Sequence, residues 1–129
     1  VELILKGPEV RLPNGHSFRD KSGIERFNAR VQWWRPADTW AEAAVIGGGQ
    51  MEGFDMNTSI SPDLLQVTYQ DQIPVFVGHY WMTGYIQRLT ERVACLDWSV
   101  AKGGRLVAYR WDGEQIIDNN KFVSVWSRY

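Results

Sequence analysis

The sequence predicts a single domain of the β-rich mixed α/β class, spanning residues 1–129. The length suffices for one domain with a buried core, and 44% apolar against 22% charged residues is typical of a globular protein. Apolar residues recur at helical spacing only in the first third of the chain, whereas strand-like runs dominate the second half. We therefore expect one or two helices followed by a sheet.

The first half carries the helical signals. Residues 2–5 predict a short strand, and Leu-Pro-Asn-Gly at 12–15 is a turn signal. Ser22 with Glu25 three positions later is a possible capping box. Helical spacing follows in a set of four apolar residues: Ile24, Phe27, Val31 and Trp34.

These signals predict a helix over residues 22–34 that ends before Pro36. A second, shorter helix is expected over residues 39–46. Ser-Pro-Asp at 61–63 resembles an N-cap followed by proline at the first helical position, which predicts one further helical turn.

The second half predicts strands joined by turns. Lys-Gly-Gly at 102–104 is expected to form a hairpin turn, and Asp-Gly at 112–113 and Asp-Asn-Asn at 118–120 predict two more. The strand-like runs are residues 73–77, 93–98, 105–111 and 122–126.

The charge balance argues against two classes of partner. A net charge of −1 lacks the basic excess that general nucleic-acid binding or binding to a membrane surface requires. No apolar run approaches the roughly 20 residues that span a bilayer. A single cysteine, Cys95, fits a reducing compartment, so we expect a cytoplasmic protein. The opening Val-Glu-Leu-Ile-Leu is strand-like from its first residue, which is typical of a piece of a longer chain.

Seven tryptophans are many for this length. Most have apolar neighbours or lie in strand-like runs, which favours a role in core packing. A stacking surface for sugars or bases is the alternative, and it requires several indole faces exposed in one plane.

His79 is the main candidate for chemistry. It follows Ile-Pro-Val-Phe-Val at 73–77, a run typical of a strand buried on both faces, and Gly78 is expected to let the backbone turn. Ligands gather beyond the carboxyl ends of such strands, where an imidazole can bind a metal. The alternative is a structural histidine bonded to a backbone carbonyl.

Partners for His79 are scarce. His16 is expected in a solvated loop and Cys95 in the core. Asp97 ends a predicted strand and could turn toward His79. The sequence has no H-x-H, H-E-x-x-H or C-x-x-C motif, and Ile-Gly-Gly-Gly-Gln at 46–50 lacks the phosphate-loop pattern.

Several of these segments share one resemblance. Val-Phe-Val-Gly-His at 75–79 resembles the late Gly-His motif of the calcineurin-like metallophosphoesterases. Residues 93–97 and 102–110 are similar to the terminal hairpin of that family, in which a strand ending in Asp precedes a Gly-Gly turn. The segment from Lys6 to Trp34 is similar to what precedes the Gly-His motif in bacterial members known as diadenosine tetraphosphatases or serine/threonine phosphatases.

The resemblance implies the C-terminal part of a two-sheet sandwich flanked by helices. It implies a hydrolase for phosphate esters or dinucleoside polyphosphates that uses two divalent ions, which Mn, Fe or Zn would suit. His79 carries over as one metal ligand, and Asp97 as a possible residue that orients it.

The departures from the family are as informative. The motifs D-x-H, G-D-x-x-D-R-G and G-N-H-E are absent, and Trp98-Ser99 stands where many relatives have Thr-Gly. We therefore expect the chain alone to be inactive, to bind no ions, and to self-associate through an uncovered face or a sheet edge. A non-catalytic Trp-rich binding or interaction module is the alternative.

Overall fold

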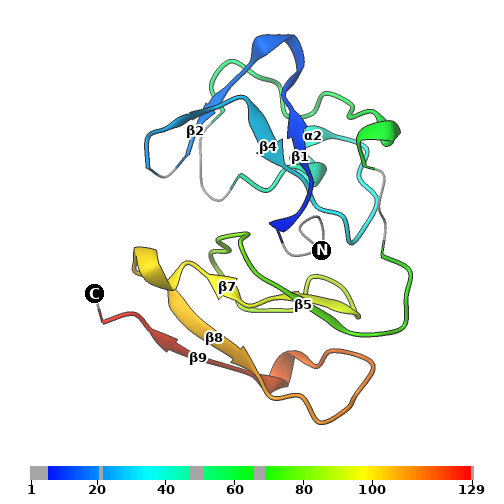
Figure 1. Ribbon diagram of the computed structural model, residues 1–129, viewed down its shortest axis with the longest axis vertical. Helices are drawn as coiled ribbons and strands as arrows, with labels where there is room; N and C mark the ends of the chain where they lie inside the picture. The colour runs from blue at the N-terminus through cyan, green and yellow to red at the C-terminus, as the bar shows by residue number, and fades with distance from the viewer. Residues whose placement is uncertain (1–5, 21, 47–50, 66–68, 129) are drawn as a thin grey trace. The chain divides into compact units, whose positions relative to one another are not determined.

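The computed structural model describes residues 6–20, 22–46, 51–65 and 69–128. This part of the chain is rich in short strands with few short helices, so the β-rich mixed class is confirmed in that coarse form (Figure 1). None of the described helices is long and apolar enough to cross a membrane.

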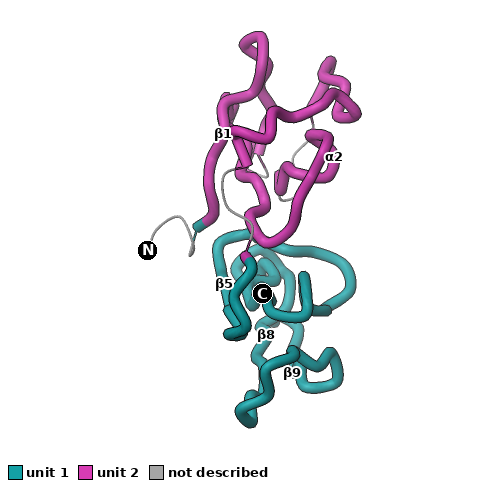
Figure 2. Tube along the Cα trace, turned by 90° about the vertical axis from the view of Figure 1, so that its right-hand side faces the viewer, with its two compact units in different colours: residues 1, 3–6, 70–129 teal, residues 2, 7–69 magenta. Residues whose placement is uncertain are grey.

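Figure 2 shows two compact units. Unit 2 comprises residues 7–69, and unit 1 comprises residues 70–128 with Lys6, within the described ranges. Because two units can form one domain or two, the single domain over residues 1–129 stays a prediction.

Unit 2 is built on two small antiparallel sheets. Strand β1 (Glu9–Arg11) pairs with β4 (Asn28–Arg30), and β2 (Phe18–Arg19) pairs with β3 (Glu25–Arg26). The predicted strand over residues 2–5 lies outside the described residues. The core of the unit gathers Val10, Leu12, Phe18, Ala29, Val31, Trp40, Ala43 and Ile60.

The predicted helix over residues 22–34 is wrong, because this segment forms β3 and β4. The Asp20 carboxylate accepts hydrogen bonds from the backbone N–H groups of Ser22 (2.8 Å) and Ile24 (3.0 Å). Gly23 adopts a left-handed φ of 77°, so the chain closes a tight β2–β3 hairpin where the helix was expected to begin. The apparent helical face does not line the core throughout, since Ile24 and Phe27 are about half exposed.

The second predicted helix is confirmed in place but not in length. Helix α2 (Trp40–Ala43) is one turn long. Its N-cap Thr39 accepts from the Glu42 N–H and the Glu42 carboxylate accepts from the Thr39 N–H, which completes a capping box. The helix ends at Ala44, whose backbone is extended (ψ 133°).

The remaining predicted turns of unit 2 are also present. The 3₁₀ turn η1 (Pro13–Gly15) carries Asn14 in a left-handed conformation, with a φ of 53°. The turn η2 (Pro62–Leu64) begins with proline after Ser61.

Unit 1 contains every strand predicted in the second half. Strands β5 (Val75–Val77) and β6 (Val93–Cys95) are parallel. After one residue the chain continues into β7 (Asp97–Trp98), which starts an antiparallel sheet of order β7-β8-β9. Strand β8 comprises Arg105–Tyr109, and β9 comprises Phe122–Trp126.

The turns of unit 1 match their predictions. The η3 turn (Val100–Lys102) and Gly103, with a φ of 79°, join β7 to β8. The segment after β8 returns through Gly113 (φ 96°) and the η4 turn (Asn119–Lys121) into β9.

Aromatic contacts link the two sheets of unit 1. The ring of Phe76 on β5 lies 5.0 Å from that of Tyr109 on β8, which lies 5.0 Å from Phe122 on β9. All three residues of β6 are fully buried, as is Ile117. These contacts pack the middle of β5 against the end of β8 and the start of β9.

Candidate functional site

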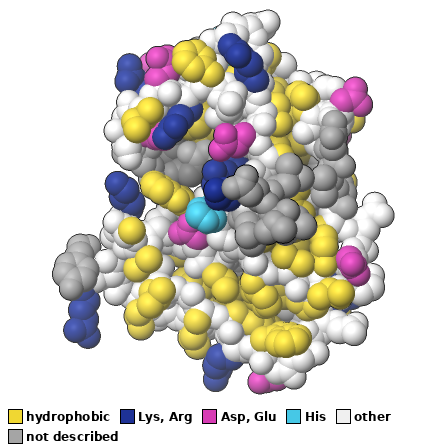
Figure 3. All heavy atoms as spheres, viewed as in Figure 1, with side chains coloured by type: hydrophobic (Ala, Val, Ile, Leu, Met, Phe, Trp, Pro, Cys, Tyr) yellow, Lys and Arg dark blue, Asp and Glu magenta, His cyan; other side chains and the backbone are white. Residues whose placement is uncertain are grey.

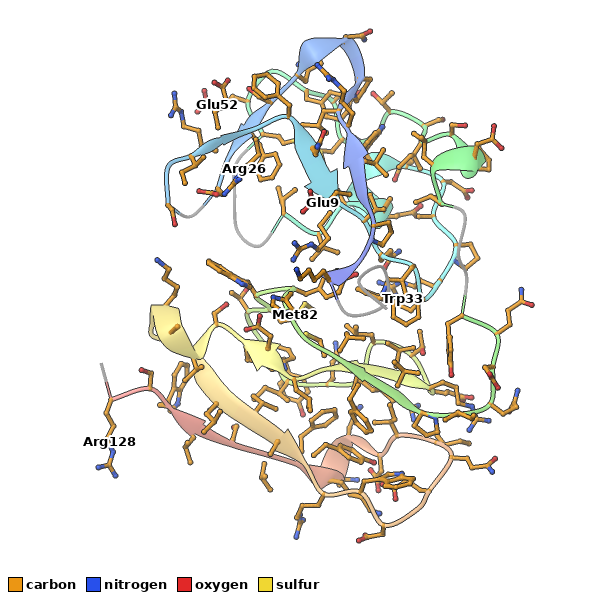
Figure 4. All side chains as sticks on the ribbon, viewed as in Figure 1. Glu9, Arg26, Trp33, Glu52, Met82 and Arg128 are labelled. Carbon is orange, nitrogen blue, oxygen red and sulfur yellow. The ribbon has the colours of Figure 1, made fainter. Side chains whose placement is uncertain are left out.

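The candidate site lies where β5 and β6 end. Because the two strands are parallel, the segments that follow them leave the same edge of the sheet. The N–H of Leu96 donates to the carbonyl of Val77 (2.9 Å), and the N–H of Met82 donates to the carbonyl of Asp97 (2.9 Å). Met82 is labelled in Figure 4. Residues 78–82 and residues 96–99, which include β7, are therefore linked, and together they are called the loop pair below.

Asp97 joins these loops through its side chain. Its Oδ2 accepts a hydrogen bond from the Trp81 N–H (3.4 Å), and its Oδ1 accepts one from the Ser99 N–H (3.1 Å). The Ser99 hydroxyl donates to the Met82 carbonyl (3.2 Å) and closes the link from the other side. Both oxygens of the Asp97 carboxylate thus accept hydrogen bonds from backbone N–H groups, one on each segment of the loop pair.

The backbone here adopts an uncommon conformation. His79 (φ 65°), Trp81 (φ 49°) and Ser99 (φ 59°) are left-handed, and Asn14 is the one other such non-glycine residue in the described chain. Each such residue costs on the order of 1–3 kcal/mol and persists only where surrounding contacts enforce it. Gly78 does not have a positive φ, and the left-handed position falls on the next residue, His79.

Both predicted site residues lie on this loop pair. The His79 side chain is exposed, two positions after the end of β5. Asp97 bonds the backbone of Trp81, two residues beyond His79, so it restrains the segment that carries the imidazole. The roles of His79 as metal ligand and Asp97 as its support stay predictions.

The other candidates lie elsewhere. His16 belongs to unit 2, where its ring lies 5.1 Å from that of Phe54. Cys95 is fully buried, and burial raises the pKa of its thiol to about 11, so it behaves as the core residue expected. Among the residues described, no three His, Cys, Asp or Glu side chains form a group that could hold a metal ion.

Sequence reasoning missed Trp81 and Ser99. Neither a bulky aromatic nor a serine signals a left-handed backbone, since glycine and asparagine are the usual residues there. The signal in the sequence was Asp97, because an aspartate at a strand end commonly accepts nearby backbone N–H groups.

The tryptophans divide into buried and exposed sets. Four are buried, which confirms core packing for most of them: Trp33, Trp34, Trp40 and Trp98. The other three are at least 39% exposed: Trp81, Trp111 and Trp126.

The exposed tryptophans do not form one platform. Trp126 pairs with Arg105 at the first position of β8, whereas Trp111 lies beyond the last. Six residues of extended chain separate these positions by about 20 Å. The Arg105 guanidinium also covers the Trp126 ring, 4.4 Å from its centroid. The stacking surface is therefore the weaker alternative.

The chain was compared with models of protein families, with curated proteins and with solved structures, and none of the three comparisons gave a match.

Proposed function

We propose that this chain is the C-terminal portion of a calcineurin-like metallophosphoesterase and supplies His79 as one ligand of a two-metal centre. The other ligands would come from segments outside these 129 residues. Substrates would be phosphate esters or dinucleoside polyphosphates, in the cytoplasm of a bacterium. The two sheets of unit 1 would belong to the two-sheet sandwich of such an enzyme.

One observation carries this proposal: beyond the carboxyl ends of two parallel strands, three non-glycine residues are left-handed, and the Asp97 carboxylate bonds the backbone of two of them, Trp81 and Ser99. Strain of this kind gathers at ligand sites, where geometry is favoured over local stability. Strand ends of this kind are also where α/β proteins place ligands.

The side chains present fit a metal centre in part. His79 is exposed and offers an imidazole on a restrained loop. Asp97 fits a supporting role better than a ligand role, because both of its oxygens already accept backbone N–H groups. When bound, two divalent ions such as Mn, Fe or Zn would activate water and stabilise charge on the phosphoryl oxygens.

The role of this chain in such a reaction is positional. The Asp97 links hold the His79 loop before any ligand arrives, so little conformational freedom remains to be lost on binding. The exposed side chain of Trp81 lies two residues from the imidazole.

The first test is the coding sequence upstream of Val1. We expect D-x-H and G-N-H-E motifs in the same reading frame. In the longer protein, His79→Asn should lower Mn²⁺-dependent turnover of p-nitrophenyl phosphate at least about 10-fold, as loss of a group near the metal does. His16→Asn is the matched control, since His16 belongs to the other unit. A frame without these motifs, or equal turnover for both variants, would overturn the proposal.

A further inference from the structure

Strand β9 is an edge strand without the usual protection. It is last in the order β7-β8-β9, and no strand in the described part of the chain pairs with its other side. Natural proteins guard such edges with charged residues, proline or bulges. Phe-Val-Ser-Val-Trp at 122–126 has no charged residue and no proline. Four of its five residues, Val123 to Trp126, are exposed.

The hydrogen bonds of β9 show which groups point outward. The Arg110 N–H donates to the Lys121 carbonyl (3.1 Å), and the Ser127 N–H donates to the Gly104 carbonyl (2.9 Å). Antiparallel ladders alternate, so every second residue from 121 to 127 bonds to β8. The N–H and C=O groups of Phe122, Ser124 and Trp126 consequently face the open edge.

The sequence of this edge is nearly the same in both directions. When two copies pair antiparallel about Ser124, each Phe122 opposes Trp126 of the second copy. Each Val123 opposes Val125, and Ser124 opposes Ser124. The outward groups of Phe122, Ser124 and Trp126 then meet in hydrogen-bonded pairs, and aromatic and β-branched pairs of this kind stabilise sheets.

We propose that the protein forms a symmetric dimer through antiparallel pairing of β9 centred on Ser124. The two three-stranded sheets would then join into one sheet of six strands. This inference is independent of the proposed function, because the β9 edge contains neither His79 nor Asp97.

The apolar face of the sheet supports the same register. Leu106 (58% exposed) pairs with Val125 (63%), and Ala108 pairs with Val123 (42%), so these four side chains share one face. Apolar side chains gather over this sheet in Figure 3. Pairing about Ser124 would make the apolar faces of both copies continuous, where cross-strand contacts between valines shield them from water.

The charges at the ends of the edge are also complementary. Arg128, labelled in Figure 4, follows β9, and the η4 turn with its N-cap Asp118 precedes β9. Antiparallel pairing brings Arg128 of each copy toward the turn that carries Asp118 in the other. Lys121 of the same turn already pairs with Asp112 and Glu114, so the turn keeps an acidic excess that favours this orientation over a parallel one.

Charge changes at the two-fold axis test the pairing. Sedimentation equilibrium of the 129-residue chain should detect a dimer as the protein concentration is raised to about 1 mM. Ser124→Lys and Ser124→Glu should each weaken it at least about 10-fold, because like charges would lie directly opposite. An equimolar mixture of Ser124→Lys and Ser124→Glu should form a heterodimer, because opposite charges would then lie opposite each other. Thr83→Lys is the control, because Thr83 is exposed and lies outside β8 and β9, and this change should leave the dimer intact.

Ser124→Cys gives a second test. Residues in a hydrogen-bonded antiparallel pair have Cα atoms about 5.5 Å apart, which a disulfide can span. Oxidation should cross-link Ser124→Cys faster than Ala108→Cys, and the buried Cys95 should remain reduced in both. The proposal would be overturned by a monomeric wild type, or by Ser124 charge variants that fold by circular dichroism and dimerise as strongly as wild type. It would also be overturned if the mixture of charge variants formed no heterodimer, or if the two cysteine variants cross-linked at equal rates.

Discussion

At the scale of single residues, the candidate site is defined by backbone conformation as much as by side-chain chemistry. His79 was predictable, because an apolar strand-like run leads directly to it. Its left-handed backbone was not predictable, since Gly78 beside it appeared the better residue for a turn. Asp97 bonds Ser99, two residues away, and Trp81, 16 residues away. Only the folded chain reveals the bond to Trp81.

The backbone of His79 makes a direct prediction about stability. His79→Ala and His79→Gly both remove the imidazole, so their difference reports the left-handed φ alone. We expect the glycine variant to be more stable by about 1 kcal/mol, because a Cβ is unfavourable in this region. Urea unfolding midpoints measure the difference.

The same pair of substitutions at Thr83 is the control. Thr83 is exposed and is not left-handed, so alanine there should equal or exceed glycine in stability. Equal stability of the two His79 variants would contradict the conformation assigned to the loop.

At the scale of elements, strands were easier to predict than the helices. Strand β9 matches its predicted range, and the runs at 73–77 and 105–111 contain β5 and β8. The helix prediction for 22–34 failed because the apparent helical spacing runs across two strands of different sheets, and none of the four apolar residues lies within either strand. Local hydrogen bonds to the Asp20 carboxylate favoured the hairpin, and spacing alone does not reveal such bonds.

The Gly-Gly turn between β7 and β8 predicts a large effect from one methyl group. A Cβ on Gly104 would collide with the backbone carbonyl of Trp98 and lie 2.8 Å from that of Ser99. Gly104→Ala should therefore destabilise the protein by about 1–3 kcal/mol or more, as overpacking against backbone does. Gly78→Ala is the control, because no described atom lies within 4 Å of its added Cβ. Thermal unfolding of both variants should separate them, and equal melting temperatures would contradict the close approach.

The loop between β8 and β9 is expected to stabilise the fold by an amount that depends on pH. The Tyr109 hydroxyl donates to Glu114 Oε1 (2.5 Å), and the Lys121 ammonium lies 3.0 Å from the same oxygen. The hydrogen bond from Tyr109 is the main cause that lowers the pKa of Glu114 from 4.5 to about 2. A lowered pKa means that the ionised carboxylate favours the folded state. This contribution is complete above pH 4.5 and is lost as the pH falls toward 2.

Glu114→Gln should remove this dependence. The stability gap between wild type and variant should be widest above pH 4.5 and should close as the pH falls toward 2. Urea midpoints at a series of pH values measure it. Glu52→Gln serves as the control, since Glu52 lies in the other unit. A gap that stays constant with pH would show that Glu114 does not titrate with folding.

At the scale of the whole molecule, composition gave the class but not the organisation. An ordinary apolar share and strand-like runs indicated a β-rich mixed protein, and the described chain agrees. The division into two units was not evident from sequence, because no linker-like stretch marks the boundary near residue 69. Long-range packing determines that boundary, and local patterns do not encode it.

This chain alone has too few metal ligands for a two-metal centre, and, if the proposed function holds, this leads to a prediction about activity. One exposed imidazole supplies a small share of a two-metal shell, and the described residues contain no group of three candidate ligands. The purified 129-residue chain should therefore hydrolyse p-nitrophenyl phosphate with Mn²⁺ no faster than Mn²⁺ alone. His79→Asn should leave this background rate unchanged, and the longer protein provides the positive control. Turnover by the chain that is lost in His79→Asn would mean that these residues complete a metal site themselves, contrary to the proposal that other segments must supply the remaining ligands.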